Sequence, residues 1–124
     1  MAHAHPTVLL VDDHADSRDA LSHLLRDAGY AVAEASNGRV ALDTLHAGLR
    51  PCIIVSDLIM PEMSGFEFRQ EQLRDAALAH IPFVVYSAIT DAPRSAAHLK
   101  PTAALRKPVE AAELVECVRT HCLK

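Results

Sequence analysis

SDLIMPEMSG, residues 56–65, carries a carboxylate out of an apolar run and then turns the chain sharply. The run before it, residues 52–55, has the length and composition of a buried strand. Asp57 follows that strand, and Met60-Pro61 and Gly65 come soon after. A charged side chain placed where a buried strand ends points to a functional edge of a sheet.

Short apolar runs alternate with helix-period segments on both sides of this stretch. We expect strands at residues 7–11, 31–35, 52–56, 81–87 and 102–106, and a short helix at 91–99. The other helices are expected to bury four sets of residues: Leu21, Leu24, Leu25 and Ala28; Ala41, Leu42, Leu45 and Leu49; Phe66, Gln70, Leu73 and Ala77; and Ala111, Leu114, Val115, Val118 and Cys122. Ser64 is a suitable N-cap for the third helix.

This order of elements predicts the α/β class, with a strand and a helix repeated five times. Such alternation gives a parallel sheet that is covered by helices on both faces. The 124 residues are enough for one domain, which we expect to span residues 1–124. In sheets of this kind, sites form beyond the carboxyl ends of the strands.

Charge and hydropathy exclude some functions. The net charge is −4, so the chain has no basic surplus with which to hold a phosphate backbone, and direct nucleic-acid binding is disfavoured. The apolar stretch at residues 8–11 is too short for a signal peptide or a membrane span. We therefore expect a cytoplasmic protein without a membrane partner.

The cysteines and histidines give little sign of a site. Cys52, Cys117 and Cys122 are odd in number and lack a secretory context, so we expect free thiols. The eight histidines show no HxxxH or HExxH spacing. Most of them are interpreted as solvated surface residues.

Polar side chains follow four of the five expected strands. They are Asp12, Asp13, Asp57, Ser87 and Lys107. Because the carboxyl ends of parallel strands meet at one edge of a sheet, we expect these residues to lie together.

Such a group suits a metal-assisted phosphoryl transfer. Three neighbouring carboxylates repel one another unless a cation neutralises them, and an oxygen-lined pocket of this kind favours Mg²⁺ over Zn²⁺. A nearby lysine and hydroxyl would bind the oxygens of a transferring phosphoryl group. Asp57 is the candidate nucleophile, since a carboxylate can form an aspartyl-phosphate.

Four segments, VLLVDDHADSR (8–18), DLIMPEMSG (57–65), VVYSA (84–88) and LRKPV (105–109), occur in this order. Together they resemble the receiver domain of two-component response regulators, such as the single-domain chemotaxis response regulator. The resemblance covers essentially the whole chain. It implies a flavodoxin-like, doubly wound fold with strand order 2-1-3-4-5.

The resemblance also implies a role for each residue. Asp57 would accept a phosphoryl group from a histidine kinase or histidine phosphotransfer protein, and the protein would then switch its binding to a downstream effector. Asp13 would bind Mg²⁺ directly and Asp12 through water, while the backbone carbonyl of Ile59 completes the metal shell. Gly65 would shape the loop because glycine tolerates unusual backbone angles.

The remaining roles concern the phosphoryl group and the switch. Ser87 would contact the phosphoryl oxygens, and Lys107 would pair with the phosphoryl charge. The Lys107-Pro108 bond resembles one that is often cis in receivers. Receivers often carry an aromatic switch residue three positions before the lysine, where this chain has Ala104. Ser87 and Ala104 are therefore the expected switch positions. Because Ala104 is not aromatic, the sequence does not indicate which face of the domain responds to phosphorylation.

Two other readings remain. A phosphatase of the haloacid dehalogenase type also uses a strand-end Asp and Mg²⁺, but it requires a second Asp where this chain has Ile59. A degenerate receiver would bind a partner without being phosphorylated, which the intact polar set disfavours. We expect a phosphoacceptor rather than an enzyme, either as a stand-alone protein or as part of a larger regulator or hybrid kinase.

Overall fold

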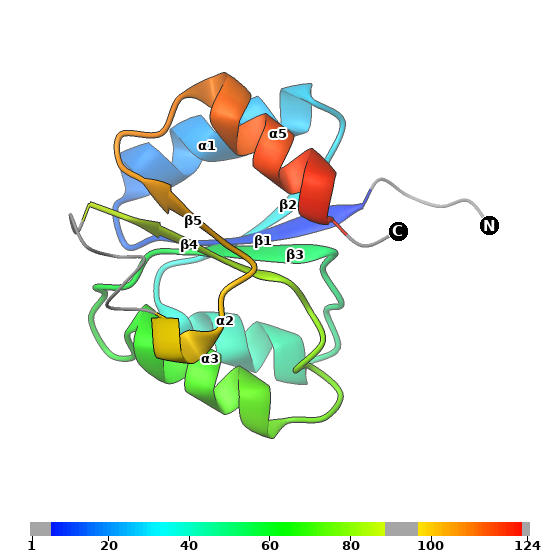
Figure 1. Ribbon diagram of the computed structural model, residues 1–124, viewed down its shortest axis with the longest axis vertical. Coiled ribbons are helices and arrows are strands. Elements are labelled where there is room, and N and C mark those ends of the chain that lie inside the picture. Colours follow the sequence, from blue (N-terminus) through cyan, green and yellow to red (C-terminus); the bar gives the residue numbers. More distant parts are fainter. Residues whose placement is uncertain (1–5, 89–96, 123–124) are drawn as a thin grey trace.

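The computed structural model of the chain describes residues 6–88 and 97–122. Five parallel strands form one sheet in the order β2-β1-β3-β4-β5 (Figure 1). The strands are β1 (Thr7–Val11), β2 (Ala31–Ala35), β3 (Ile53–Ser56), β4 (Phe83–Ser87) and β5 (Ala103–Arg106). The flavodoxin-like, doubly wound α/β fold expected from the sequence is confirmed.

Helices cover both faces of this sheet (Figure 1). α1 and α5 lie on one face, and α2, α3 and the short 3₁₀ helix η1 lie on the other. Their bounds are α1 (Ala15–Asp27), α2 (Gly38–His46), α3 (Gly65–Arg74), η1 (Ala97–Leu99) and α5 (Ala111–His121). The helix expected at 91–99 falls mainly outside the described residues, and its last three residues form η1. No helix in the described part of the chain is long and apolar enough to cross a membrane.

The three central strands, β1, β3 and β4, are buried on both faces. Ile54 of β3 packs into the core under α2 and α3, while its neighbours Ile53 and Val55 pack into the core under α1 and α5. Such a strand favours apolar side chains at successive positions, which explains the continuous apolar runs in the sequence. Because the strands are parallel, the residue that follows each strand lies at the same edge of the sheet.

α3 buries a different face from the one that the sequence predicts. The predicted face was Phe66, Gln70, Leu73 and Ala77. All of these except Phe66 are exposed, and Ala77 lies beyond the end of the helix. The helix instead buries Gly65, Phe68, Arg69 and Gln72. The prediction was wrong because two of the buried residues are polar, and apolar periodicity does not detect them.

Arg69 can be buried because backbone carbonyl groups accept its hydrogen bonds. Its Nε donates to the Leu99 carbonyl oxygen at 3.0 Å, and its Nη2 donates to that of Lys100 at 3.1 Å. Its Nη1 donates to Oε1 of Gln72 at 2.9 Å, and the guanidinium lies over the Phe83 ring at 5.1 Å from the centroid. Burial lowers the pKa of Arg69 from its ordinary value. This network fastens α3 to the segment that follows η1.

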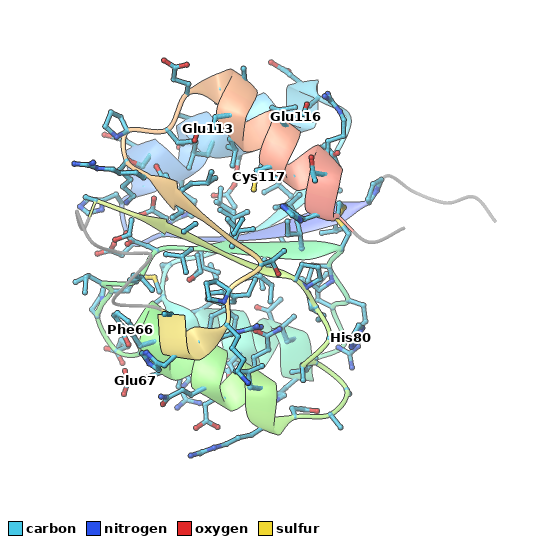
Figure 2. The ribbon with its side chains drawn as sticks, in the orientation of Figure 1. Phe66, Glu67, His80, Glu113, Glu116 and Cys117 are labelled. Atoms are coloured by element: carbon cyan, nitrogen blue, oxygen red, sulfur yellow. A yellow bond between two sulfur atoms is a disulfide. The ribbon has the colours of Figure 1, made fainter. Side chains whose placement is uncertain are left out.

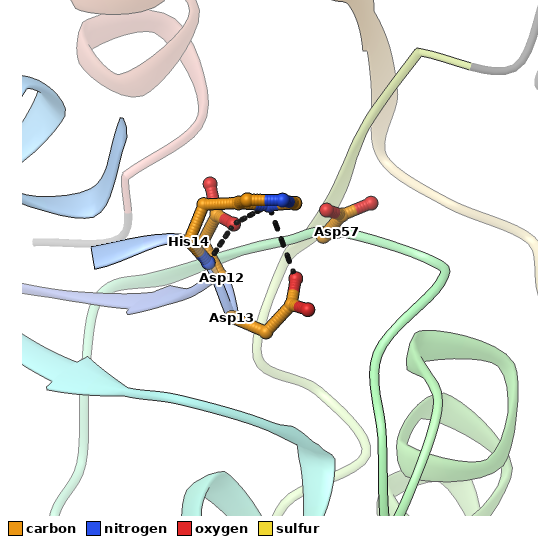
Figure 3. Close-up of side chains that lie close together, drawn as sticks. All are labelled: Asp12, Asp13, His14 and Asp57. Atoms are coloured by element: carbon orange, nitrogen blue, oxygen red, sulfur yellow. Dashed lines mark hydrogen bonds and ion pairs between the residues drawn. The ribbon is translucent and has the colours of Figure 1, made fainter. Parts of the chain in front are cut away.

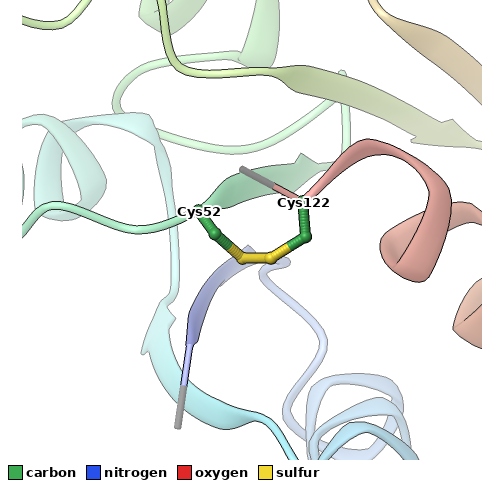
Figure 4. The surroundings of a disulfide bond; sticks show 2 residues. All are labelled: Cys52 and Cys122. Carbon is green, nitrogen blue, oxygen red and sulfur yellow. A yellow bond between two sulfur atoms is a disulfide. The ribbon is translucent and has the colours of Figure 1, made fainter. Parts of the chain in front are cut away.

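A disulfide joins the start of β3 to the end of α5 (Figure 4). It links Cys52, directly before β3, to Cys122, the C-cap of α5, with the two Cα atoms 4.8 Å apart. The expectation of free thiols is therefore wrong for these two cysteines, which the fold brings together from positions 70 residues apart. Cys117 is a free thiol on the side of α5 that faces the sheet (Figure 2). Burial, and then the charge of Glu113, raise its pKa.

Reducing this disulfide should destabilise the protein. The bond closes a long loop, so its loss frees the unfolded chain and should lower the free energy of unfolding by about 2–4 kcal/mol. Urea unfolding with and without dithiothreitol measures this difference. Cys122→Ser should match the reduced protein and no longer respond to the reductant.

Cys117→Ala is the matched control, because it removes the thiol that lies outside the bond. It should keep the full response to dithiothreitol. A wild-type protein whose unfolding midpoint is the same with and without reductant would contradict the role assigned to the bond.

Candidate functional site

The polar residues expected at one edge of the sheet do lie at that edge. Backbone hydrogen bonds continue the sheet past the strand ends: Asp57 N donates to Val11 O at 2.9 Å, and Lys107 N donates to Ser87 O at 2.9 Å. Asp12 N likewise donates to the carbonyl oxygen of Ala35 at 3.1 Å. Backbone pairing within the sheet therefore positions these residues independently of their side-chain contacts.

Asp12, Asp13 and Asp57 converge in an acidic group that also contains His14 (Figure 3). One ligand atom from each of the four residues lies within 4.8 Å of all the others. The Asp12 side chain is wholly buried, and Asp57 is 6% exposed. Among the described residues, Asp12 Oδ2 and Asp13 Oδ1 are buried without a hydrogen-bond partner. Buried carboxylate oxygens with unused lone pairs fit a hard divalent cation such as Mg²⁺.

Lys107 supplies positive charge at the same edge. Its Nζ lies 2.9 Å from Asp57 Oδ2 and 3.7 Å from Asp12 Oδ2, and it sits 4.5 Å from the centroid of the Tyr86 ring. Burial by itself would lower the pKa of Lys107. The hydrogen bond to Asp57 and the charges of Asp57 and Asp12 outweigh it, so the pKa is raised. Lys107 therefore stays charged beside the two carboxylates.

The other oxygen of Asp57 is held by the turn that follows it. Oδ1 accepts hydrogen bonds from the backbone N–H groups of Leu58 at 2.7 Å and Ile59 at 3.4 Å. The Asp57 carboxylate has a defined orientation, because one oxygen accepts hydrogen bonds from backbone amides and the other from the Lys107 ammonium group. The Ile59 side chain itself is 61% exposed, at the rim of the site.

Gly65 is required by close packing against this turn. A Cβ at Gly65 would fall on the backbone carbonyl oxygen of Asp57 and against the Cα of Leu58. The Gly65 N–H instead donates to the Leu58 carbonyl oxygen at 2.9 Å. The expected reason, an unusual backbone angle, is wrong: the left-handed residue of this loop is Glu62, with φ 69°.

Ser64 caps α3 directly beside this contact, as the sequence predicts. Its side chain accepts from the backbone N–H of Glu67 at 3.2 Å, and the Glu67 side chain accepts from the Ser64 N–H at 3.0 Å. This capping box satisfies N–H groups that the first turn of a helix leaves without partners. It fixes the amino end of α3 against the Asp57 turn.

The remaining expected positions lie on β4, on β5 and in the turn after β5. Ser87 is the last residue of β4 and is buried. Ala104 is half-buried in the core under α2 and α3 and pairs with Val85 of β4. The Lys107-Pro108 peptide bond is cis, as expected.

Two side chains of the site were not predicted from the sequence. His14 follows the aspartate pair directly, and no histidine spacing distinguishes it from the other exposed histidines. Tyr86 was placed in a strand without any role, and no sequence signal indicates that its ring would lie under Lys107. Burial raises the pKa of Tyr86, Lys107 lowers it and the two carboxylates raise it, for a net increase. Its phenol therefore stays neutral.

Fold and site together define a class: a doubly wound α/β protein with buried carboxylates and a lysine at the carboxyl edge of its sheet. The family profile described as "Response regulator receiver domain" matches residues 8–119. The chain belongs to this family and is a receiver domain of two-component systems.

Two relatives illustrate the similarity in sequence. An uncharacterized 14.6 kDa protein of Leptolyngbya boryana is 38% identical over 119 residues, which are 94% of this chain and 89% of that protein. The chemotaxis protein CheY of Pseudomonas aeruginosa is 37% identical over 82 residues, which are 65% of each chain. The matched segment therefore spans less than two thirds of the chemotaxis relative.

Two solved structures illustrate the similarity in fold. The chemotaxis response regulator CheY4 of Vibrio cholerae has a TM-score of 0.86 at 31% identity, covering 94% of this chain and 98% of that one. The receiver domain of the sensor histidine kinase PA1611 from Pseudomonas aeruginosa, which has a magnesium ion in its active-site cleft, has a TM-score of 0.88. At 22% identity, over 95% of this chain and 98% of that one, this second likeness shows the fold alone.

Gly65→Ala should disturb the Asp57 turn. The added methyl group overlaps backbone atoms that cannot rotate away, so we expect a loss of about 1–3 kcal/mol in the free energy of unfolding. We also expect amide chemical-shift changes over residues 56–60. Urea unfolding and amide spectra measure the two effects.

Gly38→Ala is the comparison variant. A Cβ there would meet Met63 and Phe68, between α2 and α3, rather than the Asp57 backbone. It should cost similar stability and leave the Asp57 and Leu58 amides nearly unchanged. Equal perturbation of these amides by both variants would contradict the specific contact at Gly65.

Proposed function

We propose that Asp57 is the phosphoacceptor of this receiver domain, in a reaction that requires Mg²⁺. The observation that carries the proposal is the hydrogen bond between Lys107 Nζ and Asp57 Oδ2 beside Asp12 and Asp13. A carboxylate has no proton to lose before it attacks, so it needs orientation and charge neutralisation rather than a general base. Both are available at Asp57.

The metal would be held by Asp12, Asp13, Asp57 and the backbone carbonyl of Ile59. The unused lone pairs of Asp12 Oδ2 and Asp13 Oδ1 support this assignment. Asp13 is the more exposed of the two, which suits a direct ligand, while Asp12 acts behind a water molecule. When bound, the ion supplies positive charge to the phosphoryl oxygens and to the three carboxylates.

The transfer step needs only groups at this edge. An Asp57 oxygen forms a bond to phosphorus as the bond from phosphorus to the donor's histidine nitrogen breaks, and that nitrogen keeps the electron pair. Lys107 neutralises charge on the phosphoryl oxygens, since its Nζ already contacts the Asp57 carboxylate. Ser87, buried at the end of β4, donates its hydroxyl to another phosphoryl oxygen.

The alternative functions lack a matching feature. A phosphatase of the haloacid dehalogenase type would use an acidic side chain two positions after the nucleophile, where this chain has the exposed apolar Ile59. A receiver that only binds a partner would have no use for a half-buried lysine beside two buried carboxylates and a partly buried third one. We therefore assign a signalling role and no enzymatic turnover of a separate substrate.

The partners follow from the reaction. A histidine kinase or histidine phosphotransfer protein would donate the phosphoryl group, and an effector protein or domain would recognise the product. Direct nucleic-acid binding is not part of the proposal, because the net charge is −4. We place the single domain, residues 1–124, in the cytoplasm. The disulfide then has to form in a reducing compartment, where such bonds are rare.

Incubation with acetyl phosphate and Mg²⁺ should add one phosphoryl group to the wild-type protein and none to Asp57→Asn. Intact-mass measurement reads the product directly. Asp43→Asn, on the exposed side of α2, is the matched control and should be labelled like the wild type. Equal labelling of Asp57→Asn would refute the assignment, and steady release of phosphate from phosphoesters would favour the phosphatase.

We further propose that the switch runs through α3 rather than through β5. In receivers as a family, the hydroxyl after the fourth strand moves toward the phosphoryl group, and an aromatic side chain on the fifth strand turns into the space that it leaves. Ala104 has no side-chain torsion with which to make this second movement. The Asp57 turn instead contacts the first residue of α3 through the bond from Gly65 N to Leu58 O. One turn along α3, Arg69 holds the carbonyl groups of Leu99 and Lys100.

A second contact joins the same two segments. The rings of Phe66 on α3 and His98 on η1 stack with centroids 6.1 Å apart and planes within 2°. Packed elements move together because the interior does not tolerate voids. A shift of α3 would therefore displace residues 97–102 before it reached β5.

Beryllofluoride, a phosphoryl mimic, should therefore shift amide resonances in residues 56–66 and 97–102. Residues 103–106 should move less. Arg69→Lys keeps the charge but cannot donate to the carbonyl groups of residues 99 and 100 at the same time. The amide chemical-shift changes of residues 97–102 should therefore fall by about half or more. Arg74→Lys, at the exposed end of α3, is the control. Large shifts along 103–106 with 97–102 unmoved would show that the usual route survives without its aromatic.

A further inference from the structure

His14 lies in the proposed metal site although its residue type is not one that Mg²⁺ favours. Its Nδ1 is 3.4 Å from Asp13 Oδ1 and 3.6 Å from Asp12 Oδ1 (Figure 3). These separations are close to those between neighbouring ligands around one ion with bonds of about 2.0–2.2 Å. The imidazole therefore stands where it can share a cation with the carboxylates.

The main chain holds His14 in this place. It is the N-cap residue of α1 with an extended backbone, and its N–H donates to Asp12 Oδ1 at 3.0 Å. Its side chain makes no capping hydrogen bond to the helix. The ring is 70% exposed, so it is not part of the core. Neither capping nor packing accounts for its orientation toward the carboxylates.

An independent feature indicates that a ligand is expected here. Asp12, whose side chain is wholly buried, keeps Oδ2 without a hydrogen bond among the described residues, and its one charged neighbour on that side is Lys107 Nζ at 3.7 Å. Buried carboxylate oxygens are costly unless a cation or a donor satisfies them. The pocket is thus built for a cation, and His14 changes which cation it prefers.

We propose that this site accepts nitrogen-binding divalent ions such as Zn²⁺ as well as Mg²⁺, and that His14 Nδ1 is the ligand that sets the preference. The inference rests on the proposed function only in using the same pocket. Magnesium takes oxygen ligands and keeps its waters, whereas an imidazole nitrogen is a favoured ligand of zinc. A carboxylate pocket with one imidazole therefore binds Zn²⁺ more tightly than the same pocket without it. Lys107 repels both divalent ions, so it does not change which of them the site binds more tightly.

The test compares the two metals on wild-type protein, His14→Ala and His14→Gln, with His23→Ala as the matched control. His23 is another exposed histidine of α1, and it lies outside the cluster. Isothermal titration at one pH gives the dissociation constants for Zn²⁺ and Mg²⁺. Nitrogen-15 spectra of the histidine rings then report whether Zn²⁺ binds Nδ1 of His14.

Both His14 variants should lose about tenfold in Zn²⁺ affinity and keep their Mg²⁺ affinity within about twofold. In the wild type, Zn²⁺ should shift the Nδ1 resonance of His14, and excess Mg²⁺ should reverse the shift. Equal losses for both metals, or a Zn²⁺ shift confined to other histidines, would overturn the inference and leave the phosphoacceptor intact. Failure of wild-type protein to bind Mg²⁺ at all would instead count against the proposed function.

Discussion

The contact between Lys107 and the buried carboxylates of Asp57 and Asp12 is the constraint on which the rest of the structure depends. Taking charges out of water is costly, and an attraction between opposite charges repays this only when the geometry is good. Lys107 Nζ reaches Asp57 Oδ2 at 2.9 Å across a sequence separation of 50 residues. The three residues follow three different strands, so the contact requires β1, β3 and β5 to be in register.

The sheet meets this requirement with its apolar interior. Its central strands are buried on both faces, so a slip in register would move strand-end charges into the core. α3 begins at Gly65, whose Cα lies close to the backbone carbonyl of Asp57. Only glycine fits at position 65, because a Cβ there would overlap that carbonyl oxygen. The residues that fix the site are thus also residues that fix the fold, from the strand ends to the first turn of α3.

Much of this arrangement could be predicted from the sequence, because it depends on local patterns. The buried strands are continuous apolar runs, and the polar residues that follow them must meet at one edge once the strands are parallel. The face of α3 could not be predicted, because Arg69 and Gln72 are buried polar residues. Arg69 donates to carbonyl groups 30 and 31 residues away, and Gln72 donates to those of Leu78 and Ile81, in the loop after the helix. The same holds for Cys52 and Cys122, which meet only because β3 begins where α5 ends. His14 was missed for a different reason: it lies in a turn directly beside two aspartates, and no spaced histidine pair marks it.

The way in which α5 and α3 are attached to the sheet restricts which elements can move when the structure changes at Asp57. α5 follows Lys107 closely, and its far end is bonded to Cys52 at the opposite end of β3 from Asp57. A helix anchored near both ends has little freedom to move as a body. α3 is different, because no disulfide ties it to the sheet, and its link to residues 98–100 consists of hydrogen bonds from Arg69 and a ring contact of Phe66. We therefore expect a change at the carboxyl edge to meet least resistance along α3, with the disulfide and the alanine at position 104 both favouring the same segment.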